Sequence, residues 1–329
     1  MSDEELAERL MNITVVARAR PMDKSRLVKI AQSKEMVAGM TGDGVNDSAA
    51  LKKVCRNAIT YAYIYVQADV GFAMGSGSEV SKEAADIVIL DDNFSSITKS
   101  VLYGRTIFKS IRKFIVFQST VNVASLLIVF LGPFMGFDFP LTLIQLLWVN
   151  LVMDTLAALA FGGEPALSRY MNEQPIERAA SIITANMWSS ILAGGGFIAF
   201  CSIIFLTYDP IAASFIRNGE PNEAVFLTAF FCFFIFMTAF NAFNVRTHKL
   251  NLFEHITENP GFIIVLVVIF CVQVTFTYIG GHVLRTVGLT AHEWFQVIAA
   301  ASLIIPFDLL RKTLIFALST ATGSKHKSD

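Results

Sequence analysis

Long apolar runs fill the chain from about Ser110 onward, and they constrain its fold more than any other feature of the sequence. A bilayer-crossing helix needs about 20 predominantly apolar residues, and six of the runs approach that length. We expect membrane-spanning helices at Phe114–Leu131, Leu141–Phe161, Met187–Tyr208, Ala224–Phe243, Gly261–Gly280 and Trp294–Leu314. The sequence therefore predicts an all-α bundle of six transmembrane helices whose principal partner is a lipid bilayer.

The composition agrees with a membrane protein. Hydrophobic residues make up 54% of the 329 residues and charged residues only 16%, which is too apolar for an ordinary soluble domain. The net charge is −1, so the chain lacks the excess of basic residues that a nucleic-acid partner would require. We expect no nucleic acid among its partners.

The distribution of basic residues predicts the orientation in the membrane. The face shared with the first hundred residues carries Arg169, Arg178, Arg246, Lys249, Arg311, Lys312, Lys325 and Lys327. The opposite loops offer only Arg217 and Arg285. Because positively charged loops stay in the cytoplasm, we expect both the first region and the C-terminus to be cytoplasmic.

The first region alternates between helical and strand-like patterns. We expect a helix at Lys24–Ser33, strands at Met36–Met40 and Val70–Ala73, and helices at Asn46–Lys53 and from Glu79. This alternation is typical of an α/β domain with a parallel sheet. A basic amphipathic stretch at residues 99–113 then continues without a helix breaker into the first apolar run. It predicts a stalk helix that joins the two regions mechanically.

The sequence Thr41-Gly42-Asp43-Gly44-Val45-Asn46-Asp47 follows the first expected strand. Open α/β sheets bind ligands at the carboxyl ends of their strands, where glycines allow close approach of a phosphate. One or two carboxylates suffice to hold a hydrated Mg²⁺, and Lys24 could neutralise a phosphoryl oxygen. The alternative is a tight turn rich in Asp and Asn, with no ligand.

Polar residues inside the apolar runs suggest a second site. Asp154 is the only acidic residue deep inside one of the runs, and a charge at that depth costs about 2.5–3.5 kcal/mol even on the lenient insertion scale. Asn150 precedes it by four residues, which places both on one face of a regular helix, and Gln118 and Asn122 show the same spacing in the preceding run. Such oxygens suit a hard cation such as Ca²⁺. The alternative is a buried polar network that only locks helices together.

The first motif and its surroundings resemble a known family. The run TGDGVND is preceded by ARARPMDK and followed by DVGFAMGSG and DDNFSSI. Together they resemble the hinge end of the phosphorylation domain of P-type cation-transporting ATPases, which has a haloacid-dehalogenase-like α/β fold. The resemblance implies that Asp43 binds Mg²⁺ beside Thr41 and Gly42, that Lys24 contacts the phosphate, and that Asn46 and Asp47 support the phosphoryl site. Ser48-Ala49 replaces the family's usual Ala-Pro or Gly-Pro, a change that we expect to be tolerated.

The second site resembles that of the plasma-membrane-type calcium pumps of this family. There Asn122, Asn150 and Asp154 match ligands of the transported ion. Ser125 and Thr238 stand at or near positions where the endoplasmic-reticulum type has glutamates. The resemblance therefore implies export of one Ca²⁺ per cycle, although H⁺ or Na⁺ pumps share the same framework.

The resemblance covers only the C-terminal part of the family's architecture. The sequence has no DKTG motif with its aspartyl nucleophile, no TGES motif and no nucleotide domain. We therefore expect ATP to be bound mainly by the remainder of the pump, and Met1 to be an internal methionine or the start of a fragment. Two other hypotheses are a truncated, non-catalytic membrane module and a soluble-type phosphatase fused to an anchor. Asp154 argues against a simple anchor, which needs no buried carboxylate.

The expected organisation has four parts. Residues 1–98 form the end of a phosphorylation domain, 99–113 the stalk, 114–316 the six spans and 317–329 a cytoplasmic tail. The tail is too short for a clear calmodulin-binding segment, and the membrane is either the plasma membrane or an endomembrane. Residues 54–67 have no family counterpart, and we interpret them as a retained intron or, alternatively, a lineage-specific insertion.

Two further features of the apolar runs favour packing over binding. Asn241 and Asn244 are interpreted as helix-end polar residues. The aromatic cluster at Phe230–Phe236 is interpreted as a lipid-facing or packing surface and not as a cofactor site.

Overall fold

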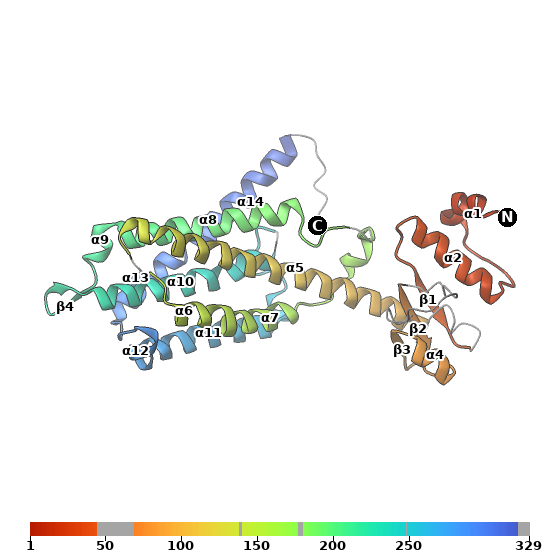
Figure 1. Cartoon of the computed structure of the whole chain (residues 1–329), viewed down its shortest axis with the longest axis horizontal. Coiled ribbons are helices and arrows are strands. Elements are labelled where there is room, and N and C mark those ends of the chain that lie inside the picture. The colour runs from red at the N-terminus through yellow and green to blue at the C-terminus, as the bar shows by residue number, and fades with distance from the viewer. Residues whose placement is uncertain (45–68, 138–139, 177–179, 248, 322–329) are drawn as a thin grey trace, which may run out of the picture. The chain divides into compact units, whose positions relative to one another are not determined.

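The computed structural model describes residues 1–44, 69–137, 140–176, 180–247 and 249–321. The chain divides into two compact units (Figure 1). The first comprises Met1–Arg105 and Ala166–Ser181, and the second comprises Thr106–Pro165 and Ile182–Asp329. Asn46, Asp47 and the segment 54–67 lie outside the described residues.

The first unit is an α/β unit built on three parallel strands. The strands are β1 (Gly39–Gly42), β2 (Val70–Met74) and β3 (Ile87–Ile89), in the order β1-β2-β3. Its helices are α1 (Asp3–Arg9), η1 (Leu10–Asn12), α2 (Pro21–Ser33), α4 (Glu79–Ala84) and η4 (Ser168–Asn172). The expected α/β pattern with a parallel sheet is therefore present among the described residues.

Strand β1 lies further along the chain than the expected strand at Met36–Met40. Gly39 pairs with Val70 and Gly42 pairs with Ala73, so the strand runs two residues into the glycine-rich motif. Before the strand, the backbone N–H of Ala38 donates to the carboxylate of Asp69, 2.9 Å away, which fixes where the pairing begins. The expected bounds of this strand were wrong because its position is determined by parallel pairing with β2, which is a long-range interaction.

The second unit is a helical bundle. Its long helices are α5 (Phe94–Leu131, which begins in the first unit), α8 (Ala185–Thr207), α10 (Glu223–Arg246), α11 (Pro260–Ile279), α13 (Ala291–Ala301) and α14 (Ile304–Ala321). One further span consists of α6 (Leu143–Leu147), the π-helical turn η3 (Trp148–Met153) and α7 (Asp154–Gly162). The short elements are η2 (Pro133–Met135), α9 (Asp209–Ala212), the hairpin β4 (Ile216–Arg217) and β5 (Glu220–Pro221), η5 (Ile256–Glu258) and α12 (Gly281–Leu284).

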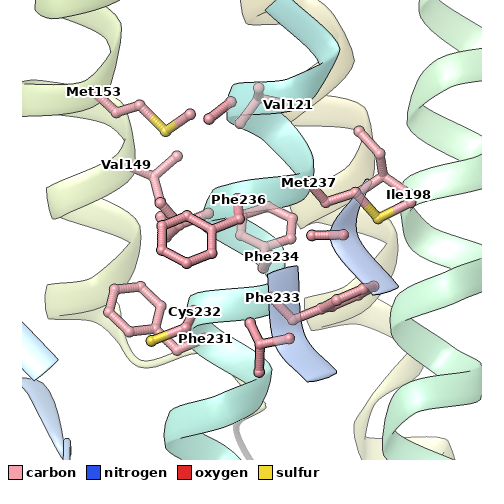
Figure 2. Close-up of a cluster of buried hydrophobic side chains, with 14 of the residues drawn as sticks. Val121, Val149, Met153, Ile198, Phe231, Cys232, Phe233, Phe234, Phe236 and Met237 are labelled. Carbon is pink, nitrogen blue, oxygen red and sulfur yellow. The ribbon is translucent and has the colours of Figure 1, made fainter. Parts of the chain in front are cut away.

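Helix α10 forms the centre of the bundle, where it contacts α8, α11, α13 and α14 (Figure 1). The phenylalanines between Phe230 and Phe236 are all buried, so this aromatic cluster is a packing surface and not a lipid-facing one. Figure 2 shows Val149 and Met153 of η3 and Val121 in the same apolar interior as Phe236 and Met237. The π-helical turn therefore packs directly on the core.

Five helical segments among the described residues are long and apolar enough to cross a membrane. They coincide with the first five expected runs. The sixth expected run, Trp294–Leu314, is not one unbroken helix, because it divides at Ser302-Leu303 into α13 and α14. Pro306 explains the break: a proline has no N–H for the carbonyl four residues earlier, and its ring collides with that carbonyl, here the one of Ser302. Whether the two helices together form a sixth span stays a prediction.

Two adjacent glycines of α8 provide a test of how tightly it packs on α5. A Cβ on Gly195 would lie 2.9 Å from Cγ1 of Val123 and 3.0 Å from the carbonyl oxygen of Thr120, whereas a Cβ on Gly196 would meet nothing within 4 Å. We expect Gly195→Val to lower the free energy of unfolding by about 1–3 kcal/mol through overpacking. Thermal unfolding in detergent measures this effect. Equal losses for Gly195→Val and the control Gly196→Val would contradict the close approach of α8 to α5.

Candidate functional site

The glycine-rich loop of the first unit begins where β1 ends. Asp43 is the first residue after the strand, and its side chain is exposed. Its backbone carbonyl accepts a hydrogen bond from the N–H of Ser78, 3.0 Å away, and the carbonyl of Gly44 accepts one from the hydroxyl of Ser81 at 2.8 Å. A Cβ on Gly77 would lie 2.9 Å from the carbonyl oxygen of Met74 and 3.1 Å from that of Asp43, so a larger residue there would force the backbone to shift. The loop after β2 therefore fixes the backbone that presents the Asp43 carboxylate.

The other residues expected at this loop are placed only in part. Thr41 and Gly42 are the last two residues of β1, with Thr41 exposed and Gly42 buried. Lys24 lies half-buried near the start of α2, and Asp23 caps that helix by accepting a hydrogen bond from the N–H of Arg20 at 3.0 Å. Among the described residues, the side chain of Asp43 makes no hydrogen bond or ion pair.

Asp154 is buried inside the bundle. It is the first residue of α7, the residue is 7% exposed, and its Oδ1 atom has no hydrogen-bond partner among the described residues. The side chain of Gln118 on α5 lies near this carboxylate, and its Oε1 atom is likewise buried and without a hydrogen-bond partner among the described residues. Buried polar atoms are nearly always satisfied, so these two oxygens are exceptions among the described residues, and either could accept a hydrogen bond or coordinate a cation.

A second buried carboxylate, which sequence analysis missed, differs from Asp154 in having ion-pair partners. Asp308 of α14 is also 7% exposed, but it forms ion pairs of 2.7 Å with both Arg311 and Lys312. No ion pair to Asp154 exists among the described residues. Asp308 is therefore neutralised by the protein itself, whereas Asp154 is not.

The π-helical turn changes the expected relation between Asn150 and Asp154. The N–H of Asp154 bonds the carbonyl of Val149, five residues earlier, which is the π-helical pattern. The spacing argument assumed a regular α-helix, and in the observed turn Asn150 is exposed whereas Asp154 is buried. Asn122 on α5 is exposed as well. No signal in the sequence identified the turn, although such turns are frequent at functional sites.

The hydroxyls of Ser125 and Thr238 are both engaged by the protein. Ser125 donates to the carbonyl of Val121 at 2.9 Å, and Thr238 donates to the carbonyl of Ile235 at 2.8 Å. Both are buried. Neither side chain carries a charge that could bind a second divalent cation.

Asn241 and Asn244 lie in the last two turns of α10 and are buried. Asn244 donates to the side chain of Asn241 at 3.4 Å and to the carbonyl of Ile304 at 3.0 Å, beside the break between α13 and α14. The second contact joins the end of α10 to α14, as expected of helix-end polar residues.

Sequence analysis also missed a buried ionic cluster just after α7. Glu164 accepts hydrogen bonds from Lys113 at 2.7 Å, Arg246 at 2.8 Å and Asn259 at 3.0 Å. The side chains of Glu164 and Arg246 are only 8% and 2% exposed. Burial alone raises the pKa of Glu164, but the charge and hydrogen bond of Lys113, with Asn259 and Arg246, outweigh burial and hold it below its usual range. The cluster ties the end of α7 to α5, α10 and the start of α11.

Comparison with known proteins identifies the family of this chain. The model of the family described as "Cation transporting ATPase, C-terminus" matches residues 138–314, more than half of the chain. This chain belongs to that family. The match spans the described helices from α6 to the first part of α14, including Asn150 and Asp154.

Curated relatives of this cation-transporting ATPase chain are named as calcium-transporting ATPases. It is 36% identical over 315 residues to "Calcium-transporting ATPase 2" of Schizosaccharomyces pombe, covering 94% of this chain and 23% of that protein. It is 39% identical over 315 residues to "Putative calcium-transporting ATPase 13, plasma membrane-type" of Arabidopsis thaliana, covering 95% and 29%. The chain thus spans about a quarter of the length of these relatives.

Proposed function

We propose that this chain is the C-terminal part of an ATP-driven pump that exports Ca²⁺ from the cytosol. The observation that carries the proposal is Asp154, a buried carboxylate in a span, with an unpartnered oxygen and no ion pair among the described residues. An uncompensated carboxylate at membrane depth is costly, and a divalent cation that passes through the site would offset that cost. In this proposal Asp154 provides the charge, and Asn150 and Asn122 provide neutral oxygen ligands.

The proposed cargo follows from the oxygen ligands and from the names of the relatives. Ca²⁺ takes six to eight oxygen ligands, and carboxylate and amide oxygens are typical of them. The relatives are named calcium-transporting ATPases. Asn122 and Asn150 are exposed in this chain, so there is room beside them for further ligands. We propose that these ligands come from the remainder of the pump, which lies outside this chain. Because Ser125 and Thr238 carry no charge, we propose one Ca²⁺ per cycle.

The first unit is proposed to be the end of a haloacid-dehalogenase-like phosphorylation domain. Mg²⁺ would be held by Asp43 beside Thr41 and Gly42, and it would neutralise charge on the phosphoryl group when bound. Lys24 would contact the phosphate, and Asn46 and Asp47 would support the site. ATP and the phosphorylated aspartate would belong to the remainder of the pump.

The proposed arrangement in the membrane keeps the four parts expected from the sequence. Residues 1–98 and the tail 317–329 would be cytoplasmic, and residues 114–316 would cross the bilayer of the plasma membrane or an endomembrane. The stalk at 99–113 would transmit movement, which is supported by the unbroken course of α5 from Phe94 to Leu131.

A chimaeric pump tests the proposal. The matching C-terminal segment of the S. pombe calcium-transporting ATPase 2 is replaced by this chain, and ATP-dependent ⁴⁵Ca²⁺ uptake is measured in sealed vesicles. We expect saturable uptake that Asp43→Asn lowers by about 100-fold or more, because the Mg²⁺ carboxylate is lost. Glu79→Gln, which changes an exposed carboxylate on α4 close to the same loop, should leave uptake unchanged.

The outcomes separate the hypotheses. Uptake of Na⁺ or H⁺ in place of Ca²⁺ would overturn the proposed cargo but keep the pump. A correctly inserted chimaera that transports no cation and forms no phosphoenzyme would contradict the proposed function and favour a non-catalytic membrane module. Equal effects of Asp43→Asn and Glu79→Gln would remove Asp43 from the proposed Mg²⁺ site.

A further inference from the structure

A closed hydrogen-bond network holds the start of the π-helical turn. The indole N–H of Trp148, the first residue of η3, donates to Oε1 of Gln273 on α11 at 3.1 Å. The amide of Gln273 donates in turn to Sγ of Cys232 on α10 at 3.4 Å. Cys232 lies 3.2 Å from the hydroxyl of Thr277, and that hydroxyl donates to the backbone carbonyl of Gln273 at 2.8 Å.

The direction of every bond in this network is determined. The single hydroxyl proton of Thr277 goes to the carbonyl of Gln273, so the thiol of Cys232 must donate to the Thr277 oxygen. The Gln273 amide is thereby oriented with its nitrogen toward Cys232 and its oxygen toward Trp148. Gln273, Cys232 and Thr277 are fully buried. A buried network in which each side-chain polar atom has a partner favours one arrangement.

The π-helical turn needs such support from its surroundings. A π-helical turn is rare and inserts one extra residue relative to an α-helix, so it persists where neighbouring contacts hold it. If the turn reverted to α-helical geometry, Asn150 would rotate about the helix axis relative to Asp154. The contact that fixes Trp148 therefore also fixes the relation between the two proposed ion ligands.

We propose that Gln273 is a positioning residue for the ion site: it holds Trp148 and thereby the π-helical turn that sets Asn150 relative to Asp154. This inference rests on the proposed function for its link to Ca²⁺. It adds a residue on α11 that touches neither the ion nor the proposed ligands. Trp148 also packs edge-on against Phe276, with ring centroids 4.8 Å apart, so removal of the hydrogen bond alone leaves much of the packing intact.

The test uses Gln273→Leu, which removes the amide with little change in volume, in the same chimaeric pump. We expect the half-saturating Ca²⁺ concentration to rise by about 10-fold, the usual effect of losing a group that orients a metal ligand, while the maximal rate per folded pump changes less. A merely structural loss would reduce the amount of active pump and leave the half-saturating concentration unchanged. Thr275→Val is the matched control, because Thr275 lies exposed on the same helix and its hydroxyl donates to the backbone carbonyl of Cys271, one turn earlier.

A double-mutant cycle and hydrogen exchange complete the test. If the effect passes through the one hydrogen bond, Trp148→Phe combined with Gln273→Leu raises the half-saturating concentration no more than the larger single change. Backbone amides of 148–154 should exchange at least about 10-fold faster in Gln273→Leu, as expected for a loss of local stability. An unchanged Ca²⁺ dependence in a transporting Gln273→Leu chimaera would overturn the role in the ion site. If the unaltered chimaera transports no Ca²⁺, the proposed function fails, and the exchange rates alone decide whether Gln273 holds the turn.

Discussion

Asp154→Asn is expected to abolish Ca²⁺ transport, with at least about a 100-fold rise in the half-saturating Ca²⁺ concentration. The substitution keeps the shape of the side chain but removes the only charge among the three proposed ligands, and ligand charge is a main determinant of Ca²⁺ affinity. Initial rates of ⁴⁵Ca²⁺ uptake by the chimaeric pump, measured over a range of free Ca²⁺ concentrations, give this value.

The same substitution should not lower stability. Because Asp154 has an unpartnered oxygen and no ion pair among the described residues, its replacement by a neutral amide removes a buried charge that the protein does not compensate. Asp308→Asn is the matched control, since Asp308 is equally buried but paired with Arg311 and Lys312. It should lower the melting temperature and leave the Ca²⁺ dependence of the folded pump unchanged. The reverse pattern would contradict the assignment of the ion site to Asp154 and would favour Asp308.

Arg246→Met is expected to destabilise the bundle by about 3–5 kcal/mol, because removing one partner of a buried pair leaves the other charge uncompensated. Arg246 is 2% exposed, bonds Glu164 at 2.8 Å and lies over the ring of Phe262. Lys249→Met serves as control, because the pair between Lys249 and Glu254 is more exposed and should contribute less than about 1 kcal/mol. Thermal unfolding in detergent measures both. Equal small losses would show that the cluster around Glu164 is not a stabilising unit.

The cluster also predicts a pH dependence. The pKa of Glu164 lies below its usual range in the folded chain, since Lys113, Asn259 and Arg246 together outweigh the opposing effect of burial. Its contribution to stability is therefore complete above the unfolded pKa of about 4.3 and is lost as the pH falls through the lowered, folded-state pKa. Arg246→Met removes part of the opposing charge, so the variant should lose stability at a higher pH during acidification.

The sequence was sufficient to predict those features that depend on local pattern. Apolar runs of bilayer length gave the positions of five helices, because length and hydropathy determine a span with little help from its neighbours. The parallel sheet was also expected from the alternation of helix and strand. Asp154 was found because it is an acidic residue inside an apolar run, although the same argument overlooked Asp308 in the sixth run.

Two features that sequence analysis missed depend on contacts between distant residues. The π-helical turn is held partly by Gln273, 125 positions beyond Trp148 in the chain. The cluster at Glu164 joins residues from α5, α10 and the loop before α11. The break at Ser302-Leu303 could have been predicted, since Pro306 lies in the printed sequence inside the expected helix. Asp308 was missed because Arg311 and Lys312, its ion-pair partners, were considered only as evidence for the orientation of the chain in the membrane.

Equilibrium ⁴⁵Ca²⁺ binding to the purified chimaera, with and without Asp154→Asn, tests most directly whether Asp154 is the charged ligand of the transported ion. We predict one saturable Ca²⁺ per pump, which is lost in Asp154→Asn and retained in Asp308→Asn. Saturable binding that survives Asp154→Asn with unchanged affinity would contradict the proposed site.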